Sequence, residues 1–188
     1  MSPDPRPPLP GWDEDARPRT TAYDEVDAAA RARGDHLRAI HDMYRDGLAQ
    51  VADVVDAVAV GAQDLGAARE AVQRLGLRAA AEQAGSFCGQ LCRAVDAHHR
   101  IEDAVLYPAL RGADPGLGPV LDRLDEEHVV VHAVLVRLDE TLVEVARRPE
   151  LVTVLAEEVA HLRRLLESHF RYEEEQICAP LGAHGIAV

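Results

Sequence analysis

The amino-acid sequence predicts an all-α fold, an up-down-up-down four-helix bundle. Hydrophobic residues make up 47% of the 188 residues and aromatic residues only 4%, and this alanine-, valine- and leucine-rich composition favours helices over a β-sandwich. Apolar residues recur at alternating intervals of three and four along four long stretches, as they do on the buried face of a helix. The connections between these stretches are fairly short, which is typical of antiparallel neighbours.

The first half of the chain is expected to contain an extended arm, two helices and a short helical connector. Residues 1–22 hold more than half of the prolines and cannot form a helix, so they are predicted to be the extended N-terminal arm. The first helix is predicted over 24–60, the connector over 65–75 and the second helix over 77–110. The apolar face of the second helix is expected to consist of Leu91, Val95, Val105 and Ala109.

The second half of the chain is expected to form the other two helices. Glycines and a proline in 112–118 predict a turn, and the third helix follows over 119–147. Pro149 suits the first turn of the fourth helix, which is expected to end before Pro180. The domain boundaries predicted in this way are an arm over 1–22, a bundle over 23–181 and a short tail over 182–188.

Charge and segment composition exclude several classes of partner. The formal net charge of −13 repels phosphate backbones, so no nucleic-acid partner is expected. No apolar run approaches the roughly 20 residues of a membrane span, and the N-terminus lacks a secretory signal, so a cytoplasmic protein without membrane association is expected. Cys88, Cys92 and Cys178 are too few for a disulfide framework and are expected to be reduced. A monomer and a small homo-oligomer are both compatible with the sequence.

Polar, titratable residues fill the gaps in the four apolar stripes. The first helix contributes one of them, and each other helix contributes a pair at spacing i, i+4, which places both side chains on one face. The seven residues are His41, His98, Glu102, His128, His132, His169 and Glu173. Buried imidazoles and carboxylates are costly without partners, so a shared metal centre in the core is predicted.

The types of these residues narrow the choice of metal. Seven ligands exceed what one tetrahedral zinc needs, and they fit two metals with the two glutamates bridging between them. Imidazole suits iron, copper, zinc and nickel, whereas carboxylates favour iron and manganese. Tyr44 lies one turn after His41 on the inward face, and is a candidate for hydrogen-bonding a metal-bound oxygen species or for ligation. Asp103 is a candidate for orienting a ligand imidazole.

The order of these motifs over about residues 35–181 resembles the hemerythrin-like (HHE) domain family. The motifs are a single histidine followed by His98-x-x-x-Glu102, His128-x-x-x-His132 and His169-x-x-x-Glu173. The resemblance implies a four-helix bundle that holds two iron ions joined by an oxo or hydroxo bridge. It also implies that the five histidines are terminal ligands and that Glu102 and Glu173 are bridging ligands.

The resemblance also suggests what the protein does. Family members bind O2 reversibly, sense oxygen, redox state or iron, or handle peroxide and nitric oxide. We therefore expect a di-iron protein that reacts with O2 or hydrogen peroxide, as a catalase-like enzyme or as a scavenger. The alternative is a non-enzymatic sensor of oxygen, redox state or nitric oxide, or an oxygen-binding module. A ferritin-like carboxylate site is a remote alternative, because only Glu158-x-x-His161 clearly fits its Glu-x-x-His motif.

Helical register leaves two choices among neighbouring residues and sets one histidine aside. His36 competes with His41 for the first ligand position, and the apolar stripe favours His41. Some family members place the carboxylate five residues after the histidine, which here would be Glu174, whereas the stripe favours Glu173. His99 points about 100° away from its neighbour on the helix, so it is expected behind the ligands or on the surface.

Overall fold

The computed structural model describes residues 6–63, 89–145 and 147–187 of the chain. Within these ranges every regular element is helical and no strand occurs, which confirms the all-α class. The predicted connector over 65–75, Cys88 and the predicted start of the second helix lie outside the described residues. In the part of the chain that is described, no helix is long and apolar enough to cross a membrane.

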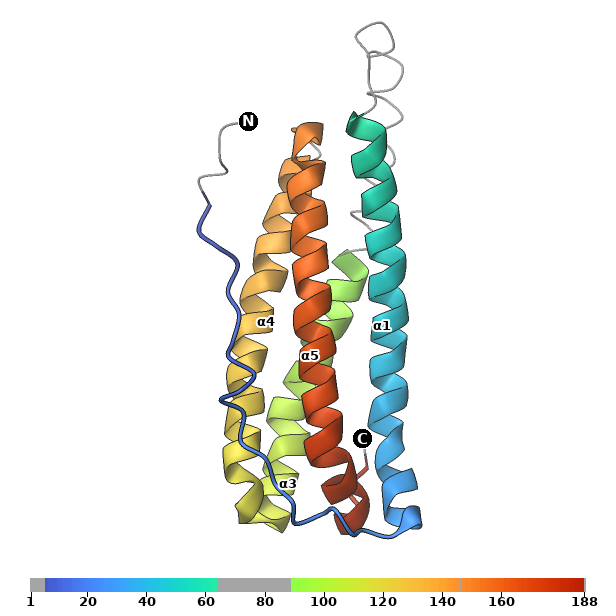
Figure 1. Cartoon of the computed structure of the whole chain (residues 1–188), viewed down its shortest axis with the longest axis vertical. Helices are drawn as coiled ribbons and strands as arrows, with labels where there is room; N and C mark the ends of the chain where they lie inside the picture. The colour runs from blue at the N-terminus through green and yellow to red at the C-terminus, as the bar shows by residue number, and fades with distance from the viewer. Residues whose placement is uncertain (1–5, 64–88, 146, 188) are drawn as a thin grey trace, which may run out of the picture.

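Among the described residues, three long helices and one helix that contains a π turn run lengthwise beside one another (Figure 1). Helix α1 spans Ala28–Gln63 and packs against α5, Val152–His184, which also packs against α4, Gly118–Val145. The remaining stretch is helical over 89–101, becomes a π-helix, η1, at Glu102–Leu106, and continues as α3, Tyr107–Ala113. Short 3-10 turns, η2 at Pro115–Leu117 and η3 at Pro149–Leu151, precede α4 and α5. The N-terminal segment 6–27 runs along α4 and α5 before it enters α1.

The hydrophobic core consists of two clusters, and a layer of polar residues lies between them. One cluster takes Leu48, Val51, Ala52 and Val55 from the inward face of α1, and the other takes Leu37. The same division recurs in α4, where the second cluster ends at Leu124 and the first begins at Val131. On each of these helices the intervening inward positions carry histidine, so the polar layer is enclosed above and below by apolar side chains.

The π-helix changes which residues of the second predicted helix face the core. Val105 and Ala109 were expected to face inward, but both are exposed, and Leu106 and Leu110 are buried instead. A π turn contains one residue more than an α turn, so every later side chain is shifted by one position on the helix face. The prediction for Val105 and Ala109 was wrong because an apolar stripe does not show this extra residue.

Helix α5 also continues past the end that the sequence predicts. It runs through Pro180 to His184 and is capped by Gly185 in the left-handed conformation, with φ of 66°. A proline inside a helix removes one backbone hydrogen bond. The last turn nevertheless packs tightly on α1, because a Cβ atom on Gly182 would lie 1.6 Å from the carbonyl oxygen of Ala30. Arg33 also donates to the carbonyl of Gly182, at 2.8 and 3.0 Å, so contacts with α1 hold the turn that the proline weakens.

The close approach of α1 and α5 predicts that glycine is required at Gly34. A Cβ atom there would lie 1.9 Å from the backbone oxygen of Cys178, so Gly34→Ala must push the two helices apart. We expect the free energy of unfolding to fall by about 3 kcal/mol, at the upper end of overpacking effects. Urea denaturation measures this loss. Gly112→Ala is the control because an added Cβ there meets nothing within 4 Å, and equal stability of the two variants would contradict the prediction.

Candidate metal centre

Seven buried side chains bring their donor atoms together in the polar layer, in two adjacent groups. The inner group is His41, His98, Glu102 and Glu173, and the outer group is His99, His128 and His169. Within each group the donor atoms lie within 4.8 Å of one another. No member is more than 8% exposed. Each long helix contributes to the layer, and Glu102 is the first residue of the π-helix.

Six donor atoms of this layer have no hydrogen-bond partner. They are Nε2 of His41, His98 and His99, both carboxylate oxygens of Glu102, and Oε2 of Glu173. Buried polar atoms are almost always paired, so a set of unpaired donors that face one another requires an explanation. Imidazole nitrogens and carboxylate oxygens are the donor types that iron and manganese accept, and they fit a metal centre better than any arrangement among themselves.

Both glutamates lie between the two groups. The Oε1 atom of Glu102 is 3.0 Å from Nε2 of His98, and its Oε2 atom is 3.7 Å from Nε2 of His128. The Oε2 atom of Glu173 is 3.2 Å from Nε2 of His41 and 3.9 Å from Nε2 of His169. Each carboxylate therefore reaches one histidine of the inner group and one of the outer group, as a ligand that bridges two metals must.

Carboxylates contact three of the histidines on the side of the ring that faces away from the donor groups. Their Nδ1 atoms contact Glu174 at 2.9 Å from His41, Asp103 at 2.7 Å from His128 and Glu127 at 3.1 Å from His169. Such a partner holds the proton on Nδ1 and leaves Nε2 as the free donor. Glu174, the alternative to Glu173 in the sequence analysis, thus contacts His41 from outside the donor set, and Asp103 contacts His128 in the same way.

Burial keeps several of these histidines neutral, which is the form that binds metals. Burial lowers the pKa of His98 to about 4 and that of His99 to well below the usual value. It also lowers the pKa of His169. Burial, together with the charge of Glu173, raises the pKa of Glu102 well above that of an ordinary carboxyl. Burial would also raise the pKa of Glu173, but the contact with the His41 imidazole and the charges of the nearby histidines lower it overall. Glu102 thus lacks sufficient positive charge nearby, whereas Glu173 has the histidines around it.

The structure brings together six of the seven side chains that the sequence selected, and leaves His132 outside. The His132 side chain is 56% exposed, and its Nδ1 atom contacts Asp96 at 3.0 Å. The buried face of α4 centres on Val131, and His132 points about 100° from that centre whereas His128 lies about 60° from it. His36 is exposed on α1, and His41 is fully buried.

His99 occupies the position in the outer group that was predicted for His132. It is only 5% exposed, its ring stacks on His128 at a centroid distance of 4.1 Å, and its Nε2 is unpaired. Sequence reasoning set His99 aside because it lies about 100° from His98 on the helix. The segment 89–106 is enclosed by helices on more than one side, so both adjacent histidines are buried.

The tyrosine that contacts the donor atoms is Tyr107 rather than Tyr44. The ring of Tyr44 lies 5.1 Å from that of His98, but its hydroxyl donates to the carbonyl of Ala94 at 3.3 Å. Tyr107 is 1% exposed, and its hydroxyl donates to Oε1 of Glu173 at 2.7 Å. Tyr107 could not be selected from the apolar pattern, because the π-helix that turns its side chain inward was not predicted.

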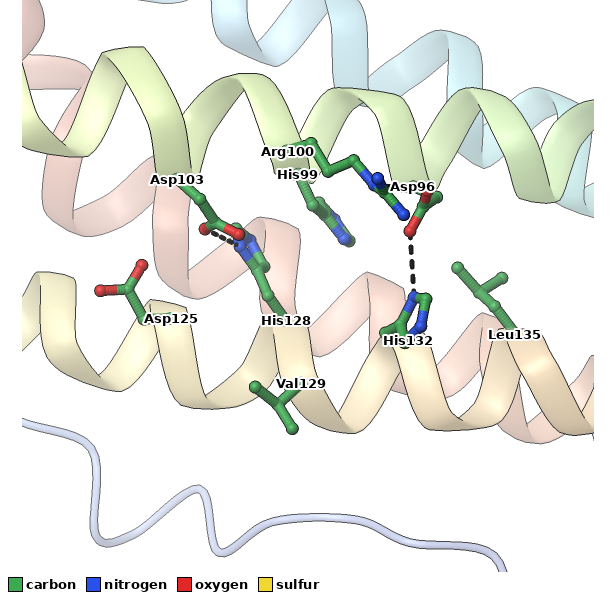
Figure 2. Close-up of a pocket in the computed structure, with 9 residues that line it drawn as sticks. All are labelled: Asp96, His99, Arg100, Asp103, Asp125, His128, Val129, His132 and Leu135. Atoms are coloured by element: carbon green, nitrogen blue, oxygen red, sulfur yellow. Dashed lines mark hydrogen bonds and ion pairs between the residues drawn. The ribbon is translucent and has the colours of Figure 1, made fainter.

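A surface pocket of about 270 Å³ leads to the outer group (Figure 2). It lies between the 89–106 segment and α4, and His99 and His128 form part of its wall. The His132–Asp96 pair lies at one end and Asp103 at the other, beside Asp125. The outer group therefore adjoins a pocket that reaches the surface, whereas no residue of the inner group lines this pocket.

Comparison with known families identifies the domain. The sequence model of the hemerythrin HHE cation binding domain matches residues 32–181, which include all seven clustered side chains. Neither a curated protein nor a solved structure matches the chain significantly. The matched range covers most of the chain and contains the two donor groups, so this protein belongs to the hemerythrin HHE cation-binding domain family.

Proposed function

We propose that this protein binds two iron ions in its polar layer and reacts there with O2 or hydrogen peroxide, as a catalase-like enzyme or a scavenger. The observation that carries the proposal is the set of six unpaired, buried donor atoms that converge between two apolar clusters. The four helices of the proposed metal-binding bundle would run in up-down-up-down order beside a proline-rich N-terminal arm, in keeping with the course of the described segments in Figure 1.

The geometry suggests how the residues share the two metals. His41 and His98 would hold one ion, and His99, His128 and His169 the other. Glu102 and Glu173 would bridge the two, since each carboxylate lies between the groups. Bound iron would supply the redox chemistry, and all seven ligands are already buried and directed at one another. His132 would not be a ligand in this arrangement, because its ring faces Asp96 and solvent.

The surroundings of the site favour a very small reactant. The pocket beside His99 and His128 has a volume of about 270 Å³, at or below the lower end of the range for organic ligands. The apolar clusters above and below the layer exclude bulk water from the inner group. The hydroxyl oxygen of Tyr107 lies 2.7 Å from Oε1 of Glu173 and donates a hydrogen bond to it, so Tyr107 places a proton donor within the site.

A second candidate is a non-enzymatic sensor of oxygen, redox state or nitric oxide, or an oxygen-binding module. The observation that favours it is a buried contact between the N-terminal segment and the carboxylate behind His169, made by Arg17 and Glu127. A change at the outer group would reach that segment directly. The ferritin-like alternative is not proposed, because Glu158 pairs with Arg137 and His161 contacts the backbone of Pro10.

The ligand set predicts different effects of the same substitution at two histidines of the pocket wall. His99→Asn should remove a ligand of the outer metal, so iron content should fall from two towards one per chain. His132→Asn should leave both irons in place, because its ring does not reach the donor set. Elemental analysis and the absorption spectrum of the iron-loaded protein measure these outcomes. Loss of iron from the His132 variant alone would show that the assignment is reversed.

The proposed reactivity is tested with the iron-loaded protein and hydrogen peroxide. Oxygen release well above that of an equal amount of free iron is expected, and Glu173→Gln should abolish it by removing a bridging carboxylate. If no oxygen is released and the reduced protein instead forms a stable coloured adduct with O2, the binding-module alternative is correct. Wild-type protein that binds no iron would contradict both.

The pH dependence of stability in the metal-free protein follows from His98. Its pKa is about 4 in the fold, against about 6.5 in the unfolded chain, so the unfolded chain binds a proton first as the pH falls. Stability should therefore decrease between pH 6.5 and 4, by an amount on the order of 3 kcal/mol at most from this group. Urea denaturation across this range should show a shallower decrease for His98→Asn. His36→Asn, on the exposed side of α1, is the control, and an unchanged slope in the His98 variant would refute the prediction.

A further inference from the structure

We infer that Arg17, in the N-terminal segment, is a positioning residue for the metal centre: by fixing Glu127 it sets the orientation of His169 and hence the affinity of the outer metal. The inference rests on the proposed function, because it requires that the outer group binds a metal. Arg17 lies before residue 32, outside the range that matches the family. The support that it provides therefore comes from a segment outside the matched domain.

Two nitrogen atoms of the Arg17 guanidinium form a bidentate pair with the Glu127 carboxylate. Its Nε donates to Oε1 of Glu127 at 2.7 Å, and its Nη2 donates to Oε2 at 2.8 Å. The third nitrogen, Nη1, donates to the hydroxyl of Ser168 at 3.0 Å. Ser168 directly precedes His169 in the chain. The Arg17 side chain is only 4% exposed and that of Glu127 is fully buried, so this is a buried, bidentate ion pair with little rotational freedom.

The Glu127 oxygen that contacts His169 also accepts a hydrogen bond from Arg17. Oε2 of Glu127 contacts Nδ1 of His169 at 3.1 Å and also accepts the hydrogen bond from Nη2 of Arg17. A second arginine, Arg123, also donates to Glu127, but to its Oε1 atom rather than to Oε2, at 3.0 Å. Glu127 therefore has another cation to balance its charge if Arg17 is removed, but no other arginine contact to its Oε2 is present among the described residues. Removing Arg17 should loosen this oxygen without leaving the carboxylate unpaired.

The N-terminal segment is anchored on both sides of Arg17, so its guanidinium is held in place. The backbone oxygen of Pro18 accepts a hydrogen bond from Tyr172 at 2.7 Å, and that of Asp13 accepts one from Arg123 at 2.7 Å. The guanidinium itself lies 4.6 Å from the ring of Tyr172 and 5.5 Å from that of Trp12. These contacts are made with α4 and α5, the helices that carry His128 and His169.

The outer group has a particular need for such support. His128 is oriented by Asp103, whose side chain is 45% exposed, and His99 has an unpaired Nε2 beside the pocket. His169 is thus the fully buried histidine of the outer group, and its supporting carboxylate is fully buried too. Carboxylates behind a ligand histidine typically change metal affinity by about 10- to 100-fold when they are disturbed.

The test is a titration of the metal-free, full-length protein with Co²⁺, whose visible absorption reports the ligands of each bound ion. Wild-type protein should bind two Co²⁺ ions. Arg17→Gln should bind the first as the wild type does and the second about tenfold or more weakly, with altered absorption of the second ion only. Arg17→Lys, which keeps the charge without the fork, should fall between the two. Arg19→Gln is the matched control, because Arg19 lies in the same segment but pairs with Glu175 at the surface.

A second pair of variants tests whether Arg17 acts through Glu127. Glu127→Gln should weaken the second ion at least as much as Arg17→Gln, and the double variant should be no weaker than Glu127→Gln alone. Equal loss at both metals, in step with a loss of stability in the metal-free protein, would show a purely structural role and overturn the inference. Unchanged affinity in Arg17→Gln would also overturn it, and failure of the wild type to bind Co²⁺ or iron would overturn the proposed function itself.

Discussion

The central constraint on this bundle is a core layer of carboxylates and imidazoles that the protein does not satisfy by itself. Seven side chains, none more than 8% exposed, present six donor atoms without hydrogen bonds. Burying them requires free energy from the two apolar clusters on either side. Binding of metal ions would remove this penalty, so that metal binding and folding are linked in this domain.

The two donor groups differ in their access to the surface pocket, and this difference suggests where a small molecule would reach the proposed metal centre. The inner group is enclosed, and the Nδ1 atom of His41 is held by Glu174, which Arg45 contacts in turn at 2.9 Å. The outer group adjoins the pocket through His99 and His128. If the layer holds two metals as we propose, a small molecule from solvent would meet the outer group first, through His99 and His128. In that case, the residues that orient the outer histidines would be best placed to tune the chemistry of the site.

Periodicity in the sequence was sufficient to predict the helices and most of the donor set, because pairs at i, i+4 stay close to one helix face. It wrongly placed His132 in the core, because each step of four residues also rotates the side chain by about 40°. His128 already lies away from the centre of the buried face, so one further step places His132 outside it. It missed Glu127, although this residue shares the inward face of α4, because its partner Arg17 lies 110 residues away. Contacts over that separation leave no local pattern in a single sequence.

The π-helix explains the other difference between the sequence and the structure, and connects the backbone with the chemistry of the site. It begins at Glu102, one of the two carboxylates between the donor groups. With regular α-helical geometry, Val105 and Ala109 would continue the inward face, and no hydroxyl would be expected beside Glu173. The extra residue brings Leu106 and Leu110 into the core and places the Tyr107 hydroxyl 2.7 Å from Glu173. π-helical turns are rare and are frequently found at functional sites. Here the turn supplies the site with a buried proton donor that the apolar pattern of the sequence could not show.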